Sequence, residues 1–135
     1  EVALKYPVHA CTDVTGFALA GHLLEMTAKS GLTIDVDFAS LPIHSNALEM
    51  YAKGETTGSS GPNRQLVADK LELAIRLNGA QEELLFDPQT SGGLLLAVAA
   101  DQAEALLQAL HAAGISPAAI IGRARTGDRS GIRIV

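Results

Sequence analysis

The most regular pattern of hydrophobic positions lies near the start of the chain. Apolar residues recur at helical spacing from Phe17 onward, within the run HACTDVTGFALAGHLLEM. Thr12 or Asp13 offers an N-cap for this helix. Lys29 supplies a basic residue for the last turn, and Gly31 is a suitable C-terminal stop. The pattern therefore predicts a helix that starts just after Asp13 and ends before Gly31.

Strand-like patterns appear further along the chain. Apolar and polar residues alternate strictly in LTIDVDF, residues 32–38, which predicts a half-buried strand. Short apolar runs within residues 94–99, 118–126 and 131–135 predict three further strands.

Two more helices are predicted at residues 45–53 and 101–113, each followed by a glycine that can end it. The polar run at residues 56–63 predicts a flexible loop. Residues 65–86 allow two interpretations. They form either a helix, a strand and a helix, or two helices broken at the Asn-Gly pair 78–79.

This order of elements predicts an α/β (α+β) fold, with helices packed on one face of a mixed or antiparallel sheet. At 135 residues, the chain is expected to form a single domain, residues 1–135. Aromatic residues make up only 4% of the chain and Trp is absent. The core must therefore consist mainly of Leu, Ile, Val and Ala.

Charge narrows the classes of partner. The net charge of −5 argues against nucleic acid, which needs a basic patch, and the densest basic group is only Arg123, Arg125 and Arg129. No apolar run reaches the roughly 18 residues that cross a bilayer, so no membrane partner is expected.

The single cysteine excludes an internal disulfide and fits a reducing, cytoplasmic compartment. The chain begins without Met or a signal-peptide pattern, and we expect a fragment of a longer protein.

The run TDVTGF places Asp13 at the expected mouth of a helix. Two interpretations stay open. The Asp13 carboxylate either stabilises a helix N-terminus or binds Mg²⁺, which takes hard oxygen ligands and commonly one or two carboxylates plus substrate phosphates. One carboxylate is not a complete metal site, so other ligands would come from elsewhere. Cys11 has no basic neighbour to activate it and is expected to be a packed structural thiol.

The run DPQTSGG, residues 87–93, also has two interpretations. Gly92 and Gly93 allow either a tight turn into the next strand or close approach of a ligand. Gln89, Thr90 and Ser91 could join successive backbone N–H groups in binding an oxyanion. No Lys follows the glycines, so this is not a P-loop.

The histidines show no metal-ligand spacing. His9, His22, His44 and His111 each lack a second ligand at a typical interval. His22 lies on the first predicted helix beside Gly21. It is expected to be a hydrogen-bonded, half-buried residue.

The runs TDVTGF, GLTIDVDFASLPI, DPQTSGG and IIGRA follow one another in this order, over nearly all of residues 8–135. In this combination the chain resembles the C-terminal domain of the selenophosphate synthetase (selenide, water dikinase) family, within the aminoimidazole ribonucleotide synthetase-like superfamily. TDVTGF and DPQTSGG form a specific pair, and either motif alone is a weaker signal.

The resemblance implies an enzyme that converts ATP, selenide and water to selenophosphate, AMP and phosphate with Mg²⁺. It implies an N-terminal ATP-binding domain as partner, a homodimer, and Asp13 as a Mg²⁺ ligand. The candidate cofactor contacts are Asn63, which the family loop retains, and the motif residues Gln89, Thr90, Ser91, Gly92 and Gly93, for which a purely structural turn stays open.

Departures from the family pattern limit what is carried over. The family's reactive Cys or selenocysteine, its nearby Lys and its glycine-rich segment are absent from this chain, so no catalytic residue is expected here and the chain alone should be inactive. Cys11 matches a non-catalytic position. Ala18 stands where the family usually has Gly. In GSSGPN, residues 58–63, Asn63 is retained but Ser59 replaces a glycine.

Two other functions remain open. One is a different enzyme of the superfamily, such as a purine-biosynthetic synthetase or a hydrogenase-maturation protein, against which the Gln-Thr-Ser of the second motif argues. The other is a non-catalytic binding or assembly module.

Overall fold

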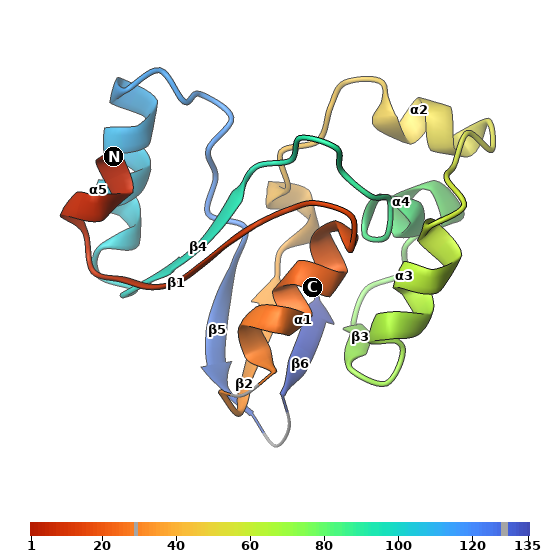
Figure 1. Cartoon of the computed structure of the whole chain (residues 1–135), viewed down its shortest axis with the longest axis horizontal. Helices are drawn as coiled ribbons and strands as arrows, with labels where there is room; N and C mark the ends of the chain where they lie inside the picture. The colour runs from red at the N-terminus through yellow and green to blue at the C-terminus, as the bar shows by residue number, and fades with distance from the viewer. Residues whose placement is uncertain (29, 128–129) are drawn as a thin grey trace.

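The computed structural model describes residues 1–28, 30–127 and 130–135 (Figure 1). Lys29 and Arg129, which figured in the predicted helix end and the basic group, lie outside the described residues. The elements, in chain order, are η1 Val2–Lys5, β1 Val8–Asp13, α1 Ala18–Thr27, β2 Leu32–Val36, η2 Phe38–Ser40, α2 Ala47–Ala52, α3 Ser60–Val67, β3 Leu71–Leu73, α4 Gly79–Leu84, β4 Leu94–Val98, α5 Ala103–Ala112, β5 Gly122–Thr126 and β6 Gly131–Ile134.

A four-stranded mixed sheet in the order β3-β6-β2-β5 forms one layer of the fold. β6 runs parallel to both β3 and β2, while β5 is antiparallel to β2. Helix α1 contacts β2 and β6 and lies across the sheet in Figure 1. Its Leu23 shares the core with Val36, Ile132 and Ile134, all of them buried. The predicted α/β fold with a mixed sheet is confirmed.

The sequence patterns did not predict β1. This strand pairs antiparallel with β4 in a separate two-stranded sheet, in which Asp13 lies opposite Leu94. The predicted N-cap at Thr12 or Asp13 is therefore wrong, because both residues belong to β1. Helix α1 begins only at Ala18, and its N-cap residue, Phe17, makes no side-chain capping bond. Pairing with a distant strand outweighs the local capping signal.

The other local predictions are largely confirmed with shorter bounds. The predicted stops Gly31, Gly54 and Gly114 all have positive φ angles, as residues that end helices or turns commonly do. The predicted loop at residues 56–63 needs correction, because α3 already begins at Ser60. Residues 65–86 resolve as the end of α3, strand β3 and helix α4. A capping box at Asn78 starts α4.

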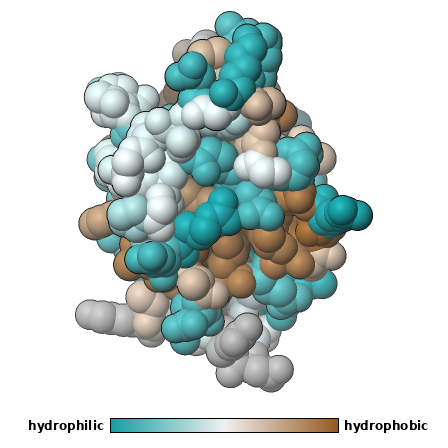
Figure 2. Space-filling model, turned by 90° about the vertical axis from the view of Figure 1, so that its right-hand side faces the viewer, coloured by the Kyte–Doolittle hydropathy of each residue, from teal (hydrophilic) through white to brown (hydrophobic). Residues whose placement is uncertain are grey.

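The remaining helices lie around the two sheets. α2 contacts α4, and α1 contacts α3. α5 contacts η1 at the far end of the β1–β4 pair (Figure 1). Figure 2 shows hydrophobic surface grouped among polar residues on the side of the molecule that carries α2, α3 and α4. Among the described residues, no helix is long and apolar enough to span a membrane.

Candidate functional site

The fold brings the two sequence motifs into direct contact, although they lie far apart in the chain. Just beyond β1, the backbone N–H of Val14 donates to the carbonyl oxygen of Gly93 at 2.9 Å. The N–H of Gln89 donates to the carbonyl oxygen of Thr15 at 3.0 Å. These bonds continue the β1–β4 pairing, in which Asp13 is opposite Leu94. The candidate site is this junction of motifs at the end of the two-stranded sheet.

Gly92 is required by the close approach of the two segments. A Cβ atom at this position would lie 2.2 Å from the carbonyl oxygen of Val14. Gly93 has open space at the same position, and its carbonyl oxygen holds Val14. Packing of backbone against backbone therefore explains Gly92 without any ligand.

Asn63 joins the junction from α3. Its side chain is buried, and Nδ2 donates to the carbonyl oxygens of Gly16 at 2.9 Å and Phe86 at 3.0 Å. Both amide protons are thus used to hold the turn before α1 against the segment that enters DPQTSGG. In this structure Asn63 acts as a brace between the two motifs.

The other residues of DPQTSGG differ in their surroundings. Gln89 is half-buried, and its Nε2 donates to the backbone carbonyl of Asp87 at 3.2 Å. Thr90 and Ser91 are exposed. The Asp87 carboxylate accepts a 2.9 Å bond from the hydroxyl of Tyr51 on α2. Burial, together with this hydrogen bond, raises the pKa of Tyr51 above its ordinary value.

A large, mainly apolar cleft of about 1480 Å³ borders the junction. Gln89, Ser91, Gly92 and Gly93 contribute to its lining, together with residues of α1, β4, α5 and β5 and of the loops between elements. Neither Asp13 nor Asn63 nor Thr90 lines it. This volume exceeds the usual 300–1,000 Å³ of a small-molecule pocket.

Asp13 is exposed at the end of β1. Among the described residues, no group of three or more His, Cys, Asp or Glu side chains is placed to hold a metal ion. An exposed carboxylate is chemically suited to Mg²⁺, which commonly takes one or two carboxylates and completes its shell with phosphate and water oxygens. Asp13 therefore fits as one ligand of a site completed from outside this chain.

Cys11 is exposed rather than packed as predicted, because β1 carries it on the outward side of the sheet.

A hydrogen-bonded chain of three side chains begins at the same junction. Thr15 Oγ1 lies 3.0 Å from His22 Nε2, and His22 Nδ1 lies 2.9 Å from Glu25 Oε2. The predicted hydrogen bonding of His22 is confirmed, and its side chain, only 7% exposed, is buried more deeply than the predicted half-buried state. The sequence analysis did not predict that Thr15 and Glu25 would be the hydrogen-bond partners of His22. The helical spacing of His22 and Glu25 was a usable signal for the second contact only.

The 56–63 segment carries a second polar network, against α4. Thr56 Oγ1 donates to the Glu83 carboxylate, and Ser60 also bonds to it. Burial opposes ionisation of Glu83. The hydrogen bonds from Ser60 and Thr56 and the nearby Arg64 guanidinium outweigh it and lower the pKa of Glu83. This network anchors the start of α3, which carries Asn63.

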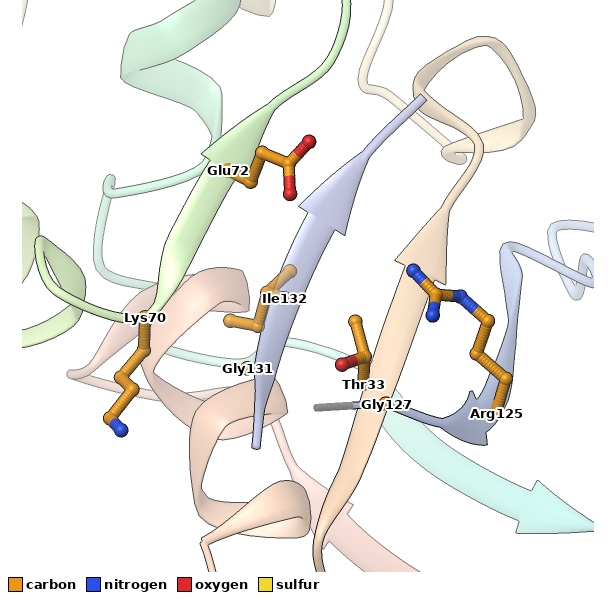
Figure 3. Close-up of a pocket in the computed structure, with 7 residues that line it drawn as sticks. All are labelled: Thr33, Lys70, Glu72, Arg125, Gly127, Gly131 and Ile132. Atoms are coloured by element: carbon orange, nitrogen blue, oxygen red, sulfur yellow. The ribbon is translucent and has the colours of Figure 1, made fainter. Parts of the chain in front are cut away.

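A small polar hollow of about 220 Å³ lies on the four-stranded sheet, away from the motifs (Figure 3). Its lining includes Lys70, Glu72, Thr33 and Arg125 around Gly131. Nearby charges are of both signs: Arg125 bonds to Asp35 at 2.7 Å, and Arg133 bonds to Glu72 at 3.1 Å. The described part of this sheet thus carries paired charges rather than a patch of one sign.

The family resemblance of the sequence is confirmed by comparison with known proteins. Residues 1–135 match the family described as "AIR synthase related protein, C-terminal domain". Selenide, water dikinase of Agathobacter rectalis is 46% identical over 123 residues, which cover 91% of this chain and 35% of that protein. The enzyme of the same name from Pelobacter propionicus is 44% identical over 117 residues, covering 87% of this chain and 34% of the relative.

A third relative extends the match to almost the whole chain. Selenide, water dikinase of Treponema denticola is 39% identical over 138 residues, which cover 99% of this chain and 39% of that protein. The chain thus spans little more than a third of the length of these relatives. With its full length matched, the chain belongs to the family of AIR synthase related C-terminal domains.

Proposed function

We propose that residues 1–135 form the C-terminal domain of an ATP-dependent selenophosphate synthetase, which converts ATP, selenide and water to selenophosphate, AMP and phosphate. The observation that carries this proposal is the junction of TDVTGF and DPQTSGG, where backbone bonds join Val14 to Gly93 and Thr15 to Gln89. The relatives named selenide, water dikinase match over most of this chain and support the substrate assignment.

In this proposal the domain contributes to a Mg²⁺-nucleotide site and carries no catalytic residue of its own. A bound Mg²⁺ would neutralise phosphate charge during phosphoryl transfer, which depends mainly on positioning and electrostatics. Asp13 would hold the ion as one carboxylate ligand. Its place at a strand end braced by Asn63 and Gly92 supports a fixed position.

The 87–93 loop is the second part of the proposed site. Gln89, Thr90, Ser91 and Gly93 would face the nucleotide or the segment that binds it. Exposure of Thr90 and Ser91 leaves their hydroxyl groups accessible to such a partner. Asn63 and Gly92 would serve this loop by holding it in place.

The proposed partner is an N-terminal ATP-binding domain of the same enzyme, and the whole enzyme is proposed to be a cytoplasmic homodimer. The lengths of the relatives support the first point, because most of each lies beyond the matched region. The mainly apolar cleft beside the junction supports it further, since its size suits a protein surface better than a small molecule.

A chimeric enzyme tests the proposal. This chain would replace the matching region of the Agathobacter rectalis enzyme, to which it is 46% identical. We expect selenide-dependent formation of AMP and selenophosphate, measured by ³¹P NMR, from the chimera and none from the 135-residue chain alone. A folded chimera without dikinase activity, or activity of the chain by itself, would contradict the proposal.

A further inference from the structure

A series of hydrogen bonds through the side chains of Thr15, His22 and Glu25 connects the motif junction to the surface of α1. His22 is nearly buried, with 7% of its side chain exposed, whereas Glu25 is 54% exposed. Thr15 lies in the turn between β1 and α1. The ring of Phe17 packs beside the imidazole, with the two ring centroids 5.7 Å apart. Each ring nitrogen of His22 therefore has one defined partner.

The carboxylate of Glu25 decides where the protons lie. An ionised carboxylate only accepts, so Nδ1 of His22 must carry the proton in their 2.9 Å bond. In the neutral imidazole, Nε2 is then an acceptor. The hydroxyl of Thr15 must donate its proton to Nε2 across 3.0 Å. Glu25 thereby fixes the direction of the whole chain of hydrogen bonds.

Thr15 is the residue through which this arrangement reaches the candidate site. Its carbonyl oxygen accepts from the N–H of Gln89 at 3.0 Å and from the N–H of Ala18 at 3.0 Å. Thr15 thus joins the DPQTSGG loop and the first turn of α1 to the end of β1. A side-chain bond that holds Thr15 also holds the loop against the strand that carries Asp13.

Burial alone does not account for both bonds of His22. One bond to Glu25 would fix the orientation of the ring, and the second nitrogen could be satisfied by many groups. Instead it meets the side chain of Thr15, which belongs to the first motif and lies in the turn between β1 and α1. The resulting order of hydroxyl, imidazole and carboxylate is the arrangement in which a third group orients a histidine toward its working partner.

We propose that His22, fixed as its Nδ1–H tautomer by Glu25, is a positioning residue that acts through Thr15 on the junction of the two motifs. With its proton committed to His22, the Thr15 oxygen can only accept from other groups, so it suits a ligand that donates, such as a water molecule on a hydrated cation. The inference rests on the proposed function for its catalytic consequence, but not for the tautomer or the coupling to the loop.

The first test uses the 135-residue chain itself. Long-range ¹H–¹⁵N NMR reports the His22 tautomer, and hydrogen exchange reports the protection of the Gln89 amide. We expect the Nδ1–H tautomer in the parent chain and in Thr15→Ser. Thr15→Val keeps the shape but lacks the donor, so it should lower protection of the Gln89 amide by about 10-fold or more, equivalent to a lost hydrogen bond of about 1.4 kcal/mol. An Nε2–H tautomer in the parent chain would overturn the proposal.

The second test changes the group that fixes the tautomer. Glu25→Ala should shift His22 toward the Nε2–H form, while Glu104→Ala, another exposed helical glutamate, should leave it unchanged. In the chimeric enzyme, Glu25→Ala should lower kcat by up to about 100-fold, as a misplaced site would, with KM for ATP little changed. An unchanged tautomer and unchanged kcat would contradict the proposal. A shifted tautomer in a chimera that lacks dikinase activity would instead refute only the proposed function.

Discussion

The four-stranded sheet and the β1–β4 pair are stabilised in different ways. The larger sheet contributes fully buried side chains to the core, with Val36 at 0% and Ile132 at 2% exposure. In the smaller sheet, Leu94 is 67% exposed and Cys11 is also exposed. There, among the described residues, only Leu95 is buried in the shared core, and backbone hydrogen bonds to the motif loop and the side chain of Asn63 hold the end of the pair in place. The difference indicates that specific polar contacts hold the candidate site in place, while the four-stranded sheet contributes more of the stability of the fold.

A cavity in the larger sheet should have the greatest effect. Ile132→Ala removes a buried side chain at the centre of the core and should lower the free energy of unfolding by about 2–5 kcal/mol. Leu94→Ala in the smaller sheet is the matched control and should cost less than about 1 kcal/mol, because Leu94 is mostly exposed. Urea denaturation measures both. Equal losses would contradict the difference in burial between Ile132 and Leu94.

Gly92→Ala tests the close approach within the junction. The new Cβ would clash with the carbonyl of Val14, so we expect a loss of about 1–3 kcal/mol and local displacement of the loop. Gly93→Ala meets open space and should change stability by about 0.5 kcal/mol or less. Thermal unfolding with amide NMR shifts would distinguish them. Tolerance of both substitutions would refute the contact between Gly92 and Val14.

Asn63→Ala removes the brace between the motifs. The buried carbonyl oxygen of Phe86 and the part-buried one of Gly16 lose their side-chain donor, and we expect a cost of about 1–3 kcal/mol. Asn46→Ala is the control, because Asn46 is exposed and makes no capping bond. Faster hydrogen exchange at residues 87–93 should accompany the loss. Unchanged exchange there would show that Asn63 does not hold the loop.

Acid sensitivity gives the smallest expected effect. The pKa of Glu83 is lowered below its ordinary value of 4.5 in the folded state. Its contribution to stability is therefore present above pH 4.5 and is lost as the pH falls through the folded pKa. Glu83→Gln should flatten the loss of stability below about pH 5, compared with Glu104→Gln. Identical acid unfolding of the two variants would contradict the role of this network.

Local patterns predicted those parts of the fold that depend on local signals. Strand β2 alternates along its own sequence, and Gly54 and Gly114 end helices by adopting positive φ. Strand β1 escaped detection because its order comes from pairing with β4, a partner far along the chain. Because of this long-range pairing, Asp13 lies at the exposed end of a strand and not at the predicted helix N-cap.

The sequence indicated which residues belong to the candidate site better than it indicated what each of them contacts. The motifs identified Asp13, Asn63 and the 87–93 loop, but no local pattern indicates that Asn63 bonds to Gly16 and Phe86. Nor does the sequence reveal that Thr15 contacts His22, because that bond depends on the turn between strand and helix. Contacts across turns and between distant segments need the fold before they can be assigned.

The central claim is that Asp13 stands at a Mg²⁺-nucleotide site formed with another domain. The most direct measurement compares Asp13→Asn with Asp101→Asn, a change at another exposed aspartate, in the chimeric dikinase. We predict that Asp13→Asn lowers selenide-dependent AMP formation by about 100-fold or more, since a metal ligand supports several kcal/mol of transition-state stabilisation. Asp101→Asn should have nearly parental activity. Near-parental turnover of the Asp13→Asn enzyme at saturating Mg²⁺, with the fold intact, would contradict the account.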